Sequence, residues 1–463
     1  MVIQHRAALD LLRAQRMPMR TSLFTTAMVF AIASNANASG PLPPVVDCDT
    51  LPSPVYIQCG DTQQNLMLNL GRALSDNSTP ITLVWVTAPS CTNINLTYVG
   101  GKIGDGSNGA NVTTMSYAPS STVDATWQTT DGAATCNLPA GGVAPNVTNS
   151  ALYNSACNPP AQPATVYLAG SPASQTGQNQ TGGLGPKQAY VLAVPRGTTA
   201  VGMTAEEAYF LFGFGPTMLA AMSASLAPWT DAMQVFIRKN GTSTLLAWGA
   251  NIQIPGSKFQ GIQESGSPQV VAALEGSTNP GAAIGMIGAE VYDTLRASLQ
   301  VLAFRAFHQY AAYFPDSTET SRDKKNLRDG HYTVWSPTVW MDFTDGTPTS
   351  DYPQGTPLNQ TARFVIDIIN NQDVTLTGIA PPDFDTQQIV AEVGLVPDCA
   401  MKVQRSFEGG PLSLYQVAAP AAGGPGSCTC KYEATVDVST CATCDTNTPC
   451  ATGVCREGYC EEY

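Results

Sequence analysis

The sequence predicts an exported protein of the α/β class that carries a small disulfide-rich segment at its C-terminus. Three observations support this prediction. The N-terminus has the pattern of a secretory signal, residues 188–345 alternate between strand and helix patterns, and seven cysteines lie within residues 428–463. A chain of 463 residues is long enough for two or three domains.

The first 38 residues are predicted to be a cleavable signal. Arg13, Arg16 and Arg20 precede an apolar run from Ser22 to Ala33, and the small residues of Ala36-Asn37-Ala38 follow it. We therefore expect the mature chain to begin at Ser39. No later stretch contains about 18 uninterrupted apolar residues, so no membrane span is expected.

The composition agrees with export and argues against a nucleic-acid partner. The 13 cysteines are expected to form disulfides, and their odd number leaves at least one thiol unpaired or paired with another chain. The net charge of −13 disfavours nucleic acid as a partner. It does not exclude a small anion in a recess, because nearby donors govern such a site.

The pattern of the chain changes near Lys187. From Ser39 to about Lys187 the chain contains short strands, five cysteines and polar tracts, and residues 104–135 and 170–185 are predicted to be long surface loops. From about Gln188 to Asp345 strand patterns alternate with helix patterns. This alternation predicts an α/β domain around a central sheet.

Particular elements of this α/β region can be placed by their residues. Tyr190–Val194 is an apolar run that predicts a buried strand. Thr204–Ala208 opens a predicted helix, with Thr204 as the cap and Glu207 at the capping-box position. Further helices are expected around Gln269–Leu274 and Tyr292–Tyr313.

The C-terminal segment, residues 428–463, follows a linker at residues 417–427 that is rich in Ala, Pro and Gly. Its cysteines predict a small module stabilised by disulfides rather than by a hydrophobic core. Zinc binding at Cys441-x-x-Cys444 is the less favoured alternative, because no histidine lies nearby and export favours oxidation. The spacing leaves the connectivity open.

The most informative motif is Arg238-Lys-Asn-Gly-Thr-Ser-Thr244. A predicted strand, Met233–Ile237, leads into the arginine, and an apolar helical pattern follows the hydroxyl residues Thr242, Ser243 and Thr244. A helix N-terminus offers free N–H groups to an anion, and an arginine can bind an oxyanion through two parallel hydrogen bonds. The same residues also suit an ordinary helix cap, so the motif alone leaves both interpretations open.

Two earlier segments place polar residues next to predicted elements. Thr50-Leu-Pro-Ser-Pro-Val-Tyr56 puts a hydroxyl and an apolar residue before a Pro-x-Pro step and a predicted helix start. Ile81–Val86 is a predicted strand, and Ser90 follows its carboxyl end, where open α/β sheets bind their ligands. Each segment on its own also suits a plain surface loop.

Candidate catalytic groups are scarce. His5 belongs to the predicted signal, His308 lies in a helical pattern, and His331 lies in a predicted turn before a strand. The sequence contains no Gly-x-Ser-x-Gly elbow, zinc-binding helix motif, phosphate-loop lysine motif or dinucleotide fingerprint. We therefore expect neither an enzyme nor a bound metal or cofactor.

Together, these segments resemble the phosphate-binding subunit of bacterial phosphate ABC transporters. That family opens with Thr-Phe-Pro-x-Pro-Val-Tyr, which Thr50–Tyr56 matches except for Leu51 in place of the phenylalanine. Its most specific motif is an arginine, two residues and Gly-Ser-Gly-Thr, which Arg238–Thr244 matches except for Ser243 in place of the second glycine. The resemblance touches scattered points from about residue 48 to about residue 345.

The resemblance implies a two-lobed fold of the type II periplasmic-binding-protein class, with the ligand in the cleft between the lobes. Lobe 1 would comprise residues 39–190 and 336–416, and lobe 2 residues 191–335. The family's acidic residue, which accepts a hydrogen bond from protonated phosphate, is expected near residues 146–150, where the sequence offers no carboxylate. The implied ligand-binding residues are Thr50, Leu51, Ser90, Arg238, Thr242, Ser243 and Thr244.

The resemblance thus predicts an exported solute-binding protein for phosphate or a related oxyanion, with an ABC permease as its partner. The alternative is a surface-displayed structural or adhesive protein that reuses the binding-protein fold without transport. Genes for a permease and an ATPase beside this one would favour uptake. A phosphoester hydrolase is less favoured, because no nucleophile–base pair can be assembled from the sequence.

Overall fold

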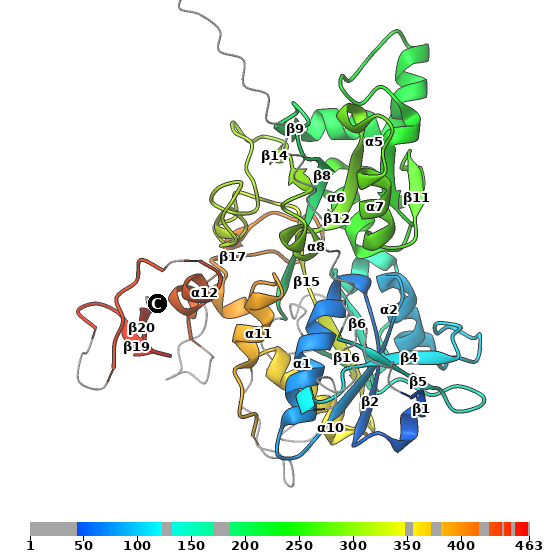
Figure 1. Ribbon diagram of the computed structural model, residues 1–463, viewed down its shortest axis with the longest axis vertical. Coiled ribbons are helices and arrows are strands. Elements are labelled where there is room, and N and C mark those ends of the chain that lie inside the picture. Colours follow the sequence, from blue (N-terminus) through cyan, green and yellow to red (C-terminus); the bar gives the residue numbers. More distant parts are fainter. Residues whose placement is uncertain are drawn as a thin grey trace, which may run out of the picture. The chain divides into compact units, whose positions relative to one another are not determined.

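The computed structural model describes residues 44–122, 132–169, 185–347, 355–371, 381–415, 426–437, 439–445 and 450–461 (Figure 1). The predicted signal, residues 1–38, and nearly all of the predicted loop at residues 170–185 lie outside the described residues. No helix in the described part of the chain combines the length and the apolarity that crossing a membrane requires.

Two sheets organise the described residues, and the first holds eight strands. In spatial order they are β1 (Val46–Asp47), β5 (Ala134–Asn137), β4 (Thr114–Tyr117), β3 (Thr82–Thr87), β2 (Pro54–Cys59), β6 (Val147–Ser150), β16 (Val339–Phe343) and β7 (Val166–Ala169). Strands β2 and β3 are parallel along their whole length, from Pro54 opposite Thr82 to Cys59 opposite Thr87. The loops that follow these two strands therefore leave the sheet at the same edge.

Helices cover both faces of this first sheet. Helix α1 (Gln64–Asp76) buries Leu66, Leu70 and Leu74 at four-residue spacing against one face, where α10 (Gln360–Ile369) and α11 (Thr386–Glu392) also contribute. Helix α2 (Ser90–Val99) contacts β6 and packs Ile94 into a separate cluster. Strand β16 contributes buried side chains to both faces of the sheet, because neighbouring side chains of a strand point in opposite directions.

The second sheet holds six strands among the described residues. They are β11 (Ile262–Glu264), β10 (Val235–Arg238), β12 (Ile284–Gly288), β8 (Lys187–Pro195) and β13 (Leu299–Val301) in spatial order, with β15 (Trp335–Pro337) paired to the first residues of β8. Its flanking helices are α5 (Ala205–Ala221), α6 (Ser243–Ile252), α7 (Ser267–Glu275) and α8 (Ala289–Thr294). Every residue of β8 is buried, which fits its central position.

The chain passes between the two sheets at β15 and β16. Trp335–Pro337 pairs with Lys187–Ala189 of the second sheet, and Val339 already belongs to the first sheet. Thr338 is the residue between the two strands, and its backbone N–H donates to the carbonyl of Pro186. The remaining helices and strands are short: β9 (Gly202–Thr204), β14 (Ala303–Arg305), α9 (Lys325–Arg328), β17 (Val403–Gln404), β18 (Ser413–Leu414), α12 (Thr429–Val436), β19 (Val454–Arg456) and β20 (Tyr459–Glu461).

Six disulfides account for twelve of the thirteen cysteines. They are Cys48–Cys136, Cys91–Cys157, Cys399–Cys428, Cys430–Cys441, Cys444–Cys455 and Cys450–Cys460. The zinc alternative is therefore wrong, because Cys441 and Cys444 belong to different disulfides. The unpaired cysteine is Cys59, which is fully buried in β2 and so is not placed to join another chain.

Several predicted elements are confirmed. Strands occupy Tyr190–Val194 and most of Ile81–Val86, and α7 covers the predicted helix at Gln269–Leu274. The predicted capping box is present, since the hydroxyl of Thr204 accepts from the N–H of Glu207 and the Glu207 carboxylate accepts from the N–H of Thr204.

Other predictions are wrong for identifiable reasons. The helix expected at Tyr292–Tyr313 ends at Thr294, and strands β13 and β14 follow, because the residues from Leu299 alternate between buried and partly exposed positions. The helix start expected after Thr50 is strand β2. Part of the expected loop at residues 104–135 forms β4 and the start of β5, which pair with each other.

Because Cys59 is the sole free thiol and is buried, a thiol reagent is expected to label the native protein hardly at all. Burial also raises the pKa of the Cys59 thiol, which keeps it in the unreactive protonated form. Unfolding in denaturant without reductant is expected to expose one thiol per chain. Fast labelling of the native protein, or a second thiol after unfolding, would contradict this arrangement.

Candidate functional site

A small cavity of about 80 Å³ lies where the carboxyl ends of β2, β3 and β10 meet. Asp61 reaches it from the loop after β2, Ser90 from the loop after β3, and Arg238 from the last residue of β10. The first two come from the first sheet and the third from the second sheet. The cavity therefore belongs to the interface between the two halves of the protein.

Arg238 is the central cation of this cavity. Its side chain is 1% exposed, and its Nη1 lies 3.0 Å from Oδ2 of Asp61. The same Nη1 donates to Oγ of Ser267 at 2.7 Å, and Nη2 donates to the carbonyl of Ser265 at 3.3 Å. Nε has no hydrogen-bond partner among the described residues. The guanidinium is thus held in place while part of its donor capacity stays unused.

Asp61 is the counter-charge of Arg238. Its Oδ2 also accepts from the backbone N–H of Ser267 at 3.0 Å. Burial raises the pKa of Asp61, but the charge of Arg238 and the hydrogen bonds from Ser267 outweigh burial, so the pKa lies below its ordinary value. At neutral pH Asp61 is therefore a carboxylate that can only accept hydrogen bonds.

Three helices begin at this cavity. Helix α2 starts at Ser90, α6 at Ser243 and α7 at Ser267, each directly after a loop that borders Arg238 or Asp61. Helix N-termini present free N–H groups and a partial positive charge, so these three favour an anion at their meeting point. No side chain caps the start of α6, because the Thr242 hydroxyl donates instead to the carbonyl of Lys239.

The structure brings four of the predicted binding residues together. Ser90, Arg238, Thr242 and Ser243 line the cavity. Thr244 does not line it, although it lies in the first turn of α6 and its buried hydroxyl has no partner among the described residues.

Thr50 and Leu51 are not brought to the cavity. They precede β2, whereas the cavity follows its last residue, and a strand of six residues spans about 20 Å. The Thr50 hydroxyl donates to the carbonyl of Asp47, and Leu51 packs beside a hydrophobic cluster of the first sheet. The family motif at Thr50–Tyr56 therefore marks the start of β2, whereas the cavity lies after its end.

Asp61 lines the cavity and was not among the residues predicted from the sequence. A carboxylate was sought near residues 146–150, which form strand β6 and do not border the cavity. The available signal was Cys59-Gly60-Asp61, an acidic residue directly after a buried strand. The helix start expected after the Pro-x-Pro step hid that signal, because it left no predicted strand that ends at Cys59.

The comparisons with known proteins concern fold. No protein-family model matches the chain, and no curated protein matches it. Among solved structures, a putative phosphate ABC transporter substrate-binding protein from Clostridium perfringens, with bound phosphate, is similar at 11% identity and a TM-score of 0.43, over 74% of this chain and 99% of that one. An ABC-type phosphate transport receptor from Vibrio cholerae is similar at 9% identity and a TM-score of 0.40, over 74% and 100%.

The likeness is not restricted to transport proteins. The reduced regulatory domain of OxyR from Pseudomonas aeruginosa is similar at 9% identity and a TM-score of 0.32, over 72% of this chain and all of that domain. The predicted α/β class with a disulfide-rich C-terminal segment is confirmed, and the fold resembles that of phosphate-binding proteins. At these identities and TM-scores the likeness gives no argument about a ligand.

A buried polar chain lies beside the cavity and joins the two sheets. Nε2 of Gln63 donates to Oε1 of Gln188 at 3.3 Å, and Gln188 donates to the carboxyl group of Glu290. All three side chains are buried. Burial raises the pKa of Glu290 to about 8, and the nearby charge of Asp61 adds to the increase.

Glu290 is expected to make the stability of the protein depend on pH. A carboxyl group whose pKa is raised in the folded state holds its proton there longer than in the unfolded chain. Stability is therefore lost as the pH rises from the ordinary glutamate value of 4.5 to about 8, and it levels off above that. Glu290→Gln should remove this part of the pH dependence, as measured by thermal unfolding across that range. Parallel curves for the two proteins would show that Glu290 ionises normally.

Proposed function

We propose that the cavity around Arg238 and Asp61 binds one small tetrahedral oxyanion that carries a proton, with phosphate as the preferred ligand. The observation that carries the proposal is the presence of a fixed cation and a fixed carboxylate in one cavity of about 80 Å³, at the meeting point of three helix N-termini. Neither charge alone would distinguish one oxyanion from another.

The two charges have different roles in this proposal. Arg238 binds anionic oxygens, aided by the hydroxyl of Ser90 and the N-terminus of α6. Asp61 accepts a hydrogen bond from the protonated oxygen of the ligand. Sulfate has no proton at neutral pH, so its oxygen would place lone pairs against those of the carboxylate, which is costly in a recess.

The size of the cavity supports a ligand of this class. Its volume of about 80 Å³ leaves room for a group of a few heavy atoms. A single tetrahedral oxyanion fits such a space, whereas a nucleotide or a sugar phosphate does not. The lining contains no histidine and no free cysteine, and we therefore propose binding rather than catalysis.

The position of the cavity supports a mechanism of opening and closing. Asp61 follows a strand of the first sheet and Arg238 ends a strand of the second, so the ligand would enter between the two halves and replace their direct ion pair. We propose a hinge motion between the half built on the first sheet and the half built on the second sheet, of the kind that solute-binding proteins use.

We further propose that the protein is exported and delivers its ligand to an ABC permease. The predicted signal at residues 1–38 supports export, and the six disulfides support an oxidising compartment. The permease rests on the sequence resemblance alone.

Arg238→Lys is expected to weaken phosphate binding by at least about tenfold, because lysine keeps the charge beside Asp61 but lacks the planar fork of donors. Titration calorimetry with phosphate and arsenate measures this loss, and circular dichroism checks that the variant is folded. Thr50→Ala serves as the control and should bind like the native protein, since Thr50 lies away from the cavity. Absence of heat with phosphate, arsenate and sulfate on the folded native protein would refute the proposal.

Asp61→Asn is expected to reduce the preference for phosphate over sulfate by about 10- to 100-fold, the worth of one hydrogen bond to a charged group. The asparagine amide can donate to an unprotonated oxygen, so sulfate should gain affinity while phosphate loses it. Competition between the two anions on native and variant protein gives the ratio directly. An unchanged ratio would remove Asp61 from the role of discriminating group.

A further inference from the structure

Residues 396–408 pack against β8 and β15, the strands of the second sheet next to the connection between the two sheets. At the start of this stretch, Val396 and Lys187 exchange backbone hydrogen bonds of 3.0 and 2.7 Å. Lys187 is the first residue of β8, where that strand pairs with β15. Residues 396–408 are named the brace below.

A buried ion pair strengthens this first contact. Nζ of Lys187 lies 2.6 Å from Oδ1 of Asp398, and the two side chains are 2% and 8% exposed. Asp398 also accepts from the hydroxyl of Tyr415. Among the residues that the structure describes, the other side-chain hydrogen bond of Lys187 goes to the uncharged carbonyl of Gly185. Separating the brace from β8 would leave a buried cation without its counter-charge, which is costly.

The other end of the brace contacts β15 and the first half of the protein. Arg405 donates to the carbonyl of Thr333 at 2.7 Å, and its guanidinium lies 4.2 Å from the ring centre of Trp335. Glu408 accepts from Ser336 at 2.8 Å. The hydroxyl of Tyr153, which lies beyond β6, donates to the carbonyl of Arg405 at 2.8 Å. The brace therefore contacts β8 and β15 of the second sheet and Tyr153, which follows a strand of the first sheet.

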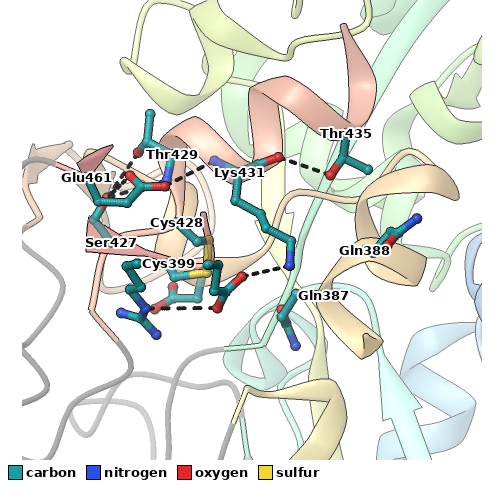
Figure 2. Close-up of a disulfide and its surroundings, with 12 residues drawn as sticks. Gln387, Gln388, Cys399, Ser427, Cys428, Thr429, Lys431, Thr435 and Glu461 are labelled. Atoms are coloured by element: carbon teal, nitrogen blue, oxygen red, sulfur yellow. Dashed lines mark hydrogen bonds and ion pairs between the residues drawn. A yellow bond between two sulfur atoms is a disulfide. The ribbon is translucent and has the colours of Figure 1, made fainter. Parts of the chain in front are cut away.

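The cysteine-rich segment is covalently attached to this brace. Figure 2 shows the disulfide between Cys399, next to Asp398, and Cys428, the residue before α12. Helix α12 is held by further contacts: Lys431 pairs with Asp385 beside α11, and Glu433 lies 2.7 Å from Arg328 of α9. One disulfide and two ion pairs thus fix α12 to parts of the chain that surround the connection.

We propose that the brace limits the separation of the two lobes, and that the cysteine-rich segment holds the brace in place through the Cys399–Cys428 disulfide. The segment then has a mechanical role, which the Cys430–Cys441 disulfide supports because it joins α12 to the rest of the segment. The inference rests on the proposed function in one respect: it assumes that the two lobes open and close around the ligand. Its evidence is the set of contacts that the brace makes with Lys187 and β15 on one side and with Tyr153 on the other.

Hydrogen exchange on the full-length oxidised protein, without any added oxyanion, tests this proposal. Replacing Cys399 and Cys428 by serine should speed the exchange of the Lys187 and Val396 amides by about tenfold or more, because their pairing opens locally. The matched control replaces Cys444 and Cys455 by serine, which removes a disulfide confined to the C-terminal segment and should leave these amides unchanged. Amides of β3 serve as the reference within each protein.

The outcomes separate the proposal from its alternatives. Unchanged exchange at Lys187 and Val396 in the first variant, or equal acceleration in the control, overturns it. If β3 also accelerates, the variant has unfolded as a whole, and Asp398→Asn then decides the matter, since it removes the charge facing Lys187 without touching a disulfide. Acceleration confined to Lys187 and Val396 in Asp398→Asn supports the brace, and protection equal to the native protein refutes it. Failure to bind phosphate leaves this result unaffected.

Discussion

The contact between Arg238 and Asp61 is the interaction on which the site depends. It joins the end of a strand in the second sheet to the loop after a strand in the first, so each half of the protein supplies one charge. The contact forms because the carboxyl ends of β2, β3 and β10 converge and because helices start directly after those ends. Buried Arg238 would be costly without Asp61, and the partial charges of the helix N-termini leave the cavity suited to one further negative group.

Local patterns allowed much of the second sheet to be predicted from sequence. Apolar runs such as Tyr190–Val194 and the Thr204 capping box have short-range causes, and both are found as expected. Arg238 and Ser90, each predicted to follow a strand, both line the cavity. The prediction failed at the first segment: a helix start was expected where the chain forms β2, and Thr50 was selected before that strand although Asp61, after it, is the residue at the cavity. An error as long as one strand exchanges a residue before the strand for a residue after it, at the opposite end of the sheet.

The features that could not be predicted depend on contacts between distant residues. Nothing in the local sequence of Lys187 indicates Asp398 as its partner, since the two are 211 residues apart. The same holds for the disulfide connectivity and for the buried chain through Gln63, Gln188 and Glu290. Buried polar groups such as these are stable only when tertiary structure supplies their partners. Secondary-structure propensities and hydrophobic periodicity therefore do not predict them.

Thr338 has a consequence for how the two halves can move. It is buried, its N–H is bonded to Pro186, and the strands on either side of it belong to different sheets. A junction of one residue offers two rotatable backbone angles and little spare length of chain. In the hinge motion proposed above, Thr338 would be the pivot. Asp61 and Arg238 would then separate along an arc and return to the same register on every closure.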